Sequence, residues 1–143
     1  MKRWVILLGA LAMTVTAGGF ALAAGSTQDF RGDLTAPAGG DPFGGDVVGR
    51  YEIEVRNHRV EIEAVVFSAP PQGHVFEGWL VDMETGYKLS LGQLRRSSLE
   101  FEQRMVNPWT YGVLVITVEP SGDLDPNPVA PVGGAWLPAP FGQ

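Results

Sequence analysis

The sequence predicts an all-β fold, an antiparallel β-sandwich of the immunoglobulin-like kind with six to seven strands. Two observations lead to this fold class. Short runs of alternating apolar and polar residues are separated by turn residues at a spacing of about 8–12 positions, as in sandwiches. Two further runs, around Trp79 and Ile116, are apolar on both faces, which is typical of central strands, and no amphipathic helical pattern interrupts the series.

The N-terminus predicts secretion. A basic pair, Lys2-Arg3, precedes the apolar run Trp4–Ala17, and residues 21–23 (Ala-Leu-Ala) have the small side chains of a cleavage site. We expect residues 1–23 to be a signal peptide that is removed. The alternative is an uncleaved membrane anchor, because residues 4–24 are just long enough to span a bilayer. The mature protein is expected to be periplasmic or extracellular, at the cell envelope.

Composition narrows the classes of function. The chain has 143 residues, which suits one domain with extensions, and no cysteine, which excludes disulfides, thiolate metal sites and cysteine nucleophiles. A secreted domain without disulfides points to a prokaryotic source. The net charge is −6, and loss of the basic signal makes it more negative. Such acidity disfavours nucleic acid and anionic lipid as partners, so the membrane is expected to matter only through an uncleaved anchor.

Residues 24–46 are rich in Gly and Pro and predict a flexible linker, although Phe30 and Phe43 can dock on the domain. The β-sandwich domain is expected over residues 47–137, and residues 138–143 form a C-terminal tail. The domain opens with a predicted hairpin, residues 51–56 and 59–66, in which Asn57-His58 form the turn. Cross-strand partners then place every apolar residue on one face.

The other face of this hairpin carries a ladder of four glutamates, Glu52, Glu54, Glu61 and Glu63. Like charges lie directly opposite one another in this register, at a cost of roughly 0.2–1 kcal/mol per pair. The ladder is a possible interaction surface for a basic protein partner or a cation site. The plainer interpretation is a solvated outer face, which half-buried strands normally have.

The central hairpin follows. A strand over residues 74–82 is apolar on both faces, residues 83–86 form the turn with Gly86 at positive φ, and the return strand, residues 87–91, turns Tyr87, Leu89 and Leu91 inward. Residues 99–105 predict another strand, Asn107-Pro108 a capped single turn, and residues 113–118 a second central strand.

The last predicted strand, residues 129–137, is expected at an edge of the sheet. Edges are where partners add, so Trp136 is the aromatic residue most suited to binding. The other tryptophans and tyrosines are expected to be core residues, because aromatic side chains bury large apolar areas.

Several of these segments resemble a known family. Gly-Trp-Leu-Val-Asp (78–82), Leu-Ser-Leu-Gly (89–92) and Val-Ile-Thr-Val-Glu-Pro (115–120) are similar to motifs in the extracytoplasmic C-terminal domain of anti-sigma-K-type factors. The resemblance covers about residues 51–137. It implies a β-sandwich on the outer side of the membrane. No sigma-binding region precedes it in this sequence, so the resemblance implies an envelope domain working alone, without anti-sigma activity.

No motif for catalysis is present, and we expect no enzymatic activity, no cofactor and no metal. His58 and His74 fall at a turn and at a strand start, and no nucleophile elbow, phosphate loop or zinc motif occurs. Glu77, Asp82 and Glu84 suit exposed and turn positions better than a glycosidase pair. Residues 123–127 (Asp-Leu-Asp-Pro-Asn) lack the glycine and distal glutamate of a calcium loop.

The leading hypothesis is therefore a secreted or envelope-associated, non-enzymatic binding or sensory module that contacts a protein partner. The alternative is a structural subunit of an extracellular fibre or surface layer, which assembles through residues 24–46 as an N-terminal arm that adds to a neighbour's sheet edge. A small hydrolase is the third possibility, and it lacks a nucleophile–base pair.

Overall fold

The computed structural model describes residues 26–125 and 127–143. The expected signal peptide, residues 1–23, lies outside this range. The described part is almost entirely β-structure, with one short 3₁₀ turn, η1. The elements are β1 (Gln28–Thr35), β2 (Val47–Arg56), β3 (Arg59–Val66), β4 (His74–Val81), β5 (Lys88–Gln93), β6 (Ser98–Arg104), η1 (Pro108–Thr110), β7 (Val113–Pro120) and β8 (Ala130–Trp136).

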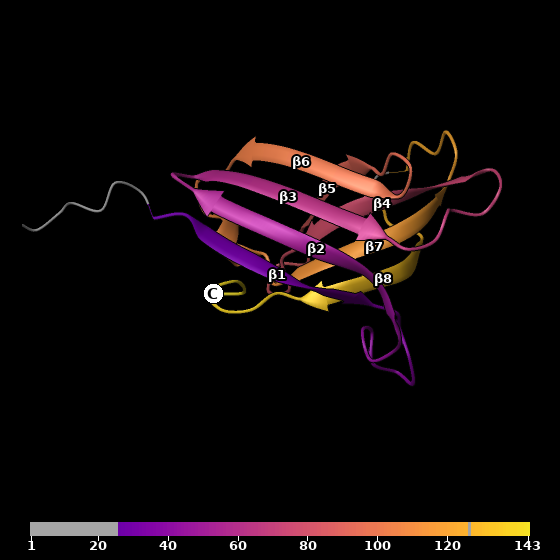
Figure 1. The fold of residues 1–143 in the computed structure, drawn as a ribbon, viewed down its shortest axis with the longest axis horizontal. Helices are drawn as coiled ribbons and strands as arrows, with labels where there is room; N and C mark the ends of the chain where they lie inside the picture. The colour runs from indigo at the N-terminus through magenta and orange to yellow at the C-terminus, as the bar shows by residue number, and fades with distance from the viewer. Residues whose placement is uncertain (1–25, 126) are drawn as a thin grey trace, which may run out of the picture.

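All strand pairs are antiparallel, and the eight strands form one sheet in the order β5-β4-β7-β8-β1-β2-β3-β6. Figure 1 shows β6, β3, β2 and β1 in front of β5, β4, β7 and β8. We call these the front half and the back half. The all-β, antiparallel prediction is confirmed. The sheet is continuous and nearly closed into a barrel, where six to seven strands in two separate sheets were expected.

The hairpin β2–β3 has the predicted register. Val55 pairs with Val60 and Ile53 with Ile62, and these side chains are buried. The turn residues Asn57 and His58 have φ values of 50° and 64°. Two consecutive left-handed residues make the tight turn whose twist matches the flanking strands, and asparagine tolerates this conformation well.

The two segments that are apolar on both faces, β4 and β7, are interior strands of the sheet, as predicted, and they pair with each other. Gly78 is opposite Ile116, and the neighbouring Trp79 is only 3% exposed. The turn after β4 has Gly86 at φ 74°, also as predicted. Tyr87 was expected to point inward and is exposed, because β5 begins one residue later and leaves Tyr87 in the turn.

Strand β1 lies inside the range for which the composition predicts a flexible linker. It pairs with β2 along its whole length, from Gln28 opposite Val55 to Thr35 opposite Val47. This segment forms a strand because apolar side chains recur on one face among its polar residues: Phe30 packs against the core and Leu34 is fully buried. The arm expected to extend a neighbour's sheet thus extends its own, and the ordered domain begins well before residue 47.

The C-terminal tail is also packed on the sheet. Phe141 is buried, with its ring centroid 4.8 Å from Phe30 and 5.0 Å from Trp109 in edge-to-face arrangements. The backbone N–H groups of Gly142 and Gln143 donate to the carbonyl of Trp109. These rings lie where β1 diverges from β8, since the two strands pair at a single position, Thr35 opposite Gly134. The tail expected over residues 138–143 therefore belongs to the folded domain.

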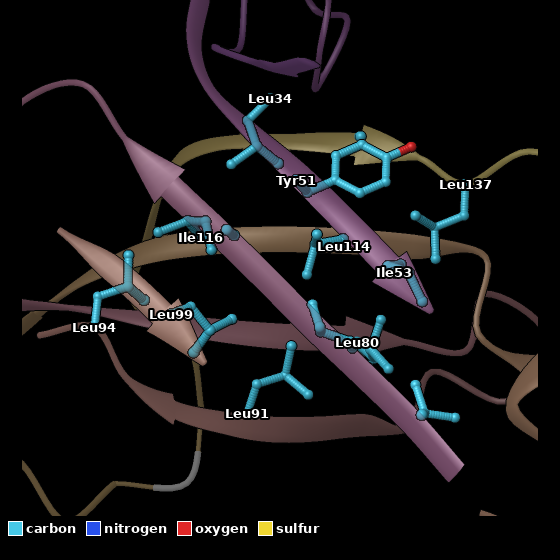
Figure 2. Close-up of a cluster of buried hydrophobic side chains, with 14 of the residues drawn as sticks. Leu34, Tyr51, Ile53, Leu80, Leu91, Leu94, Leu99, Leu114, Ile116 and Leu137 are labelled. Carbon is cyan, nitrogen blue, oxygen red and sulfur yellow. The ribbon is translucent and has the colours of Figure 1, made fainter. Parts of the chain in front are cut away.

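One apolar core joins the two halves. Side chains from both sets of strands, among them Leu80 and Leu99, fill the space between them (Figure 2). A β-carbon placed on Gly78 would lie 2.8 Å from Leu99 Cδ2, so glycine at this position leaves room for the Leu99 side chain between the front and back halves. The outer faces take no part in this shared core, so they are free to differ.

Candidate functional site

The candidate surface is the outer face of the front half. The strand register aligns its charged side chains in transverse rows across four strands. The arginine row consists of Arg56, Arg59 and Arg104. The first acidic row consists of Asp29, Glu54, Glu61 and Glu102. The second acidic row consists of Glu52, Glu63 and Glu100, with Arg31 on β1 at its end.

The four glutamates of the predicted ladder all lie on this face, directly opposed as the sequence indicated: Glu52 with Glu63 and Glu54 with Glu61. Strand β6 adds two more, Glu100 opposite Glu63 and Glu102 opposite Glu61. The sequence alternation predicted that these two side chains share one face of their strand. It did not predict that this strand pairs with β3, so their membership in the ladder was missed.

Four ion pairs cross this face, and all are solvent-exposed. Arg31 Nη2 is 2.6 Å from Glu52 Oε1, and Arg50 Nε is 3.5 Å from Asp33 Oδ1. Arg59 donates from Nε to Glu61 Oε1 at 2.8 Å and from Nη2 to Glu102. The hydrogen bond to Glu102 and its charge raise the pKa of Arg59, with a smaller contribution from Glu61. Exposed pairs contribute little stability, so these contacts mainly orient the side chains.

Two shallow hollows lie on the face. One of about 550 Å³ is at the second acidic row. Its lining includes Glu52, Glu63, Glu100, Arg31, Arg50 and Val65. The other, of about 480 Å³, is at the arginine row and the first acidic row. Its lining is Glu54, Arg56, Asn57, Arg59, Glu61, Glu102 and Arg104. We call them the acidic hollow and the mixed hollow.

Trp136, the other predicted interaction residue, does not join this surface. It was expected on an edge strand, but β8 lies between β7 and β1, and the sheet ends at β5 and β6. Trp136 is 55% exposed on the outer face of the back half, with its ring 5.6 Å from Phe43 in an edge-to-face contact. Sequence could not place it, because β1, the strand beside β8, was taken for linker.

The outer face of the back half carries a row of buried, hydrogen-bonded polar side chains. Trp79 Nε1 donates to Thr117 Oγ1 at 2.9 Å, and this hydroxyl donates to Glu119 Oε1. The same carboxylate oxygen accepts the N–H of Val129 at 3.0 Å. Thr117 and Glu119 are 2% and 4% exposed. These hydrogen bonds tie Val129, just before β8, to the central strands, which is a structural role.

The other carboxylates singled out by sequence have local roles. Asp82 Oδ1 accepts the N–H groups of Glu84 and Thr85, and these bonds, with Thr85 as the larger cause, lower the pKa of Asp82. Glu77 accepts the hydroxyl of Ser90. Asp123 and Asp125 accept the N–H two residues ahead, the geometry of Asx turns.

Neither histidine is placed for catalysis among the described residues. His58 is exposed in the β2–β3 turn, and the Nδ1 of His74 lies 3.0 Å from the backbone carbonyl of Gln72. Within residues 26–125 and 127–143, no three His, Asp or Glu side chains are grouped as metal ligands. In the same ranges no helix has the length and apolarity to cross a bilayer.

Comparisons with known proteins give no relative: no family model, no curated protein and no solved structure matches this chain. The resemblance to anti-sigma-K-type outer domains therefore stays a prediction.

Proposed function

We propose that this chain is a secreted or envelope-associated binding module without enzymatic activity, which takes a basic segment of a protein partner in its acidic hollow. This keeps the sensory or interaction role that the resemblance to anti-sigma-K-type outer domains implies. We also propose that the fold is a β-sandwich. Two facing halves that pack over one core support this, although the strands form one continuous, nearly closed sheet.

The observation that carries the proposal is the pair Glu63 and Glu100. The two side chains lie directly opposite on β3 and β6, both are exposed, and within the described part of the chain neither has a cationic partner. Directly opposed like charges destabilise a sheet by roughly 0.2–1 kcal/mol. A lysine or arginine side chain in the hollow relieves this repulsion, so binding removes a cost that the free protein bears.

The surroundings of the pair favour a basic peptide over a bare cation. Glu52, the third glutamate of the row, is already held by Arg31 at 2.6 Å, which leaves two carboxylates and no grouped set of three for a metal. Val65 lines the hollow, and Arg50, also in the lining, lies 6.0 Å from the centre of the exposed Phe67 ring. Exposed apolar side chains beside the glutamates suit a peptide with alternating basic and apolar residues.

Binding of a fluorescent oligolysine peptide, followed by anisotropy, tests the proposal. Glu63→Gln/Glu100→Gln is expected to weaken binding about 5- to 30-fold, because each lost exposed pair is worth up to about 1 kcal/mol. The matched control Glu84→Gln/Asp46→Asn removes the same charge at exposed positions away from this face. It is expected to bind like the wild type. Equal weakening in both variants means that net charge alone attracts the peptide, and the acidic hollow is then no site.

A further inference from the structure

The strands β2, β3 and β6 carry the same order of charges on the outer face of the front half. Each has an arginine, a glutamate two residues away, and a second glutamate two residues further on. The register sets these positions side by side: Arg56, Arg59 and Arg104; Glu54, Glu61 and Glu102; Glu52, Glu63 and Glu100. Alternate residues of a strand are about 6.7 Å apart, so the arginine row and the two acidic rows are evenly spaced along the strands.

The unpaired charges lie at the two ends of this pattern. Within the described residues, Arg56 and Arg104 have no acidic partner, and the glutamate pair of the acidic hollow has no basic one. The first acidic row, between them, is partly neutralised, because Arg59 donates to two of its glutamates. The unpaired arginines line the mixed hollow, and the glutamate pair lines the acidic hollow. The face therefore offers a positive and a negative binding position four residues apart along the strands, a distance of about 13 Å.

We propose that the partner segment is an extended peptide that lies along these strands and has the order acidic-x-basic-x-basic. The side chains of an extended chain recur on one face at every second residue, which is the spacing of the rows. The last basic residue lies in the acidic hollow at Glu63 and Glu100, and the middle one lies over the first acidic row. The acidic residue lies over the arginine row, where Arg104, on the same strand as Glu100, is free to donate to it. The inference rests on the proposed function and adds the acidic residue, which sets the register of the segment.

Charge complementarity favours an acidic residue on the same segment over a separate anion. An anion at the arginine row has the glutamates of the first acidic row about 6.7 Å away, and the protein as a whole is negatively charged. Basic residues of the same segment offset this repulsion, since they occupy the acidic rows and hold the acidic residue in place. A segment with basic residues only leaves the arginine row without a partner or sets a like charge against it.

Three labelled pentapeptides with blocked ends test this by fluorescence anisotropy: Glu-Thr-Lys-Thr-Lys, its isomer Lys-Thr-Glu-Thr-Lys, and the all-basic Lys-Thr-Lys-Thr-Lys. Such short peptides form no stable helix, so they test the extended spacing. The first is expected to bind the wild type about 2- to 5-fold more tightly than the all-basic peptide, because it gains an exposed ion pair. General attraction to a negative protein predicts the opposite order, because the all-basic peptide has the higher positive charge.

The isomer separates order from composition. No register gives both of its lysines an acidic row and its glutamate the arginine row. It is therefore expected to bind less tightly than either of the other two peptides, although its composition equals that of Glu-Thr-Lys-Thr-Lys.

The variant Arg56→Gln/Arg104→Gln is expected to remove the advantage of Glu-Thr-Lys-Thr-Lys and to bind the all-basic peptide at least as tightly as the wild type does. Both arginines are exposed and form no ion pair within the described chain, so the variant is expected to fold; circular dichroism checks this. The matched control Lys88→Gln/Arg95→Gln removes the same charge at exposed positions outside both hollows. It is expected to keep the wild-type order of the three peptides.

A Glu-Thr-Lys-Thr-Lys peptide that binds no more tightly than the all-basic one overturns the inference. So does an advantage that persists in Arg56→Gln/Arg104→Gln, because the arginine row then does not contact the peptide. The proposed function survives either result as long as the all-basic peptide binds through Glu63 and Glu100. An all-basic peptide that does not bind, or that binds Glu63→Gln/Glu100→Gln as tightly as the wild type, overturns the proposed function and this inference with it.

Discussion

The two halves of this sheet share an inner face and differ in their outer faces. On the back half, polar groups of the outer face are buried and bonded to one another, as in the chain from Trp79 through Thr117 to Glu119. On the front half, charged groups stand in water in rows of like sign, and several have no partner within the described chain. The back half thus buries its polar groups in contacts that stabilise the fold, whereas the front half carries like-charge repulsion along its acidic rows.

The loops explain how this division arises. The segment between β1 and β2 lays Phe43 on the back half, so closely that a β-carbon at Gly134 would lie 2.3 Å from its ring. The loop before β8 is held by the bond from Val129 to Glu119. Both long connections thus add contacts to the back half. The front half is joined by a two-residue turn at Asn57-His58, so β2 and β3 stay uncovered between their ends.

The largest effect is expected from Trp79→Ala on the back half. This side chain is almost fully buried, and loss of a buried large aromatic residue typically costs about 3–5 kcal/mol of unfolding free energy. Urea denaturation measures it. Glu63→Ala on the front half is the comparison and is expected to change the unfolding free energy by no more than about 1 kcal/mol. Similar losses in both variants would erase the distinction between the halves. If Trp79→Ala does not fold, Trp79→Phe supplies a smaller loss of the same sign.

The second-largest loss of stability is expected from Thr117→Val. It keeps the shape of the side chain but leaves the Trp79 Nε1–H and the Glu119 carboxylate short of a partner. Unpaired buried polar groups cost about 1–3 kcal/mol. Urea denaturation again measures the loss. The control is Thr27→Val, at an exposed residue just before β1 whose side chain forms no hydrogen bond within the described chain, and it is expected to change stability by a few tenths of a kcal/mol. A Thr117→Val protein as stable as the wild type would mean that the polar chain contributes nothing.

Local patterns predicted much of this architecture. The alternation on each side of Asn57-His58 fixed the β2–β3 register, because a slip of one residue would have turned Ile53 and Ile62 to solvent. The apolar faces of β4 and β7 indicated central strands for the same reason. Each of these inferences depends only on residues close in sequence, because their alternation alone shows which side chains of a strand are buried.

Pairings between segments distant in the sequence could not be predicted from local patterns. Strand β6 pairs with β3 rather than with β5, the strand before it in the sequence. This pairing depends on loop closure and on the packing of the whole domain, which no short stretch of sequence reveals. The glutamates of β6 were therefore missed as members of the ladder. Strand β1 was missed because glycine and proline dominate its surroundings, whereas only Phe30 and Leu34 carry its apolar signal. Closure of the sheet depends on both strands.

On the front half a substitution is expected to raise the free energy of unfolding, whereas the substitutions on the back half lower it. Glu63→Gln removes one charge from two directly opposed pairs, with Glu52 on β2 and Glu100 on β6. Relief of like-charge repulsion is expected to raise the unfolding free energy by roughly 0.2–1 kcal/mol, measured by urea denaturation at low salt. The gain is expected to shrink at high salt, where screening already weakens the repulsion. A loss of stability would mean that Glu63 has a stabilising partner, and the case for the acidic hollow would fail.

The smallest effect concerns the turn that closes the back half. Hydrogen bonds, first from the Thr85 N–H, lower the pKa of Asp82 in the folded protein. A lowered folded pKa adds stability above the unfolded value, about 3.9 for aspartate, and this stability is lost as the pH falls through the folded pKa. Asp82→Ala is expected to lower the melting temperature slightly at pH 7, and the gap to the wild type closes below about pH 4. Glu84→Ala, in the same turn, removes a carboxylate that accepts no hydrogen bond within the described chain and is expected to leave the melting temperature unchanged at pH 7. A gap for Asp82→Ala that is the same at pH 3 and pH 7 would show that the carboxylate's charge plays no part in holding the turn.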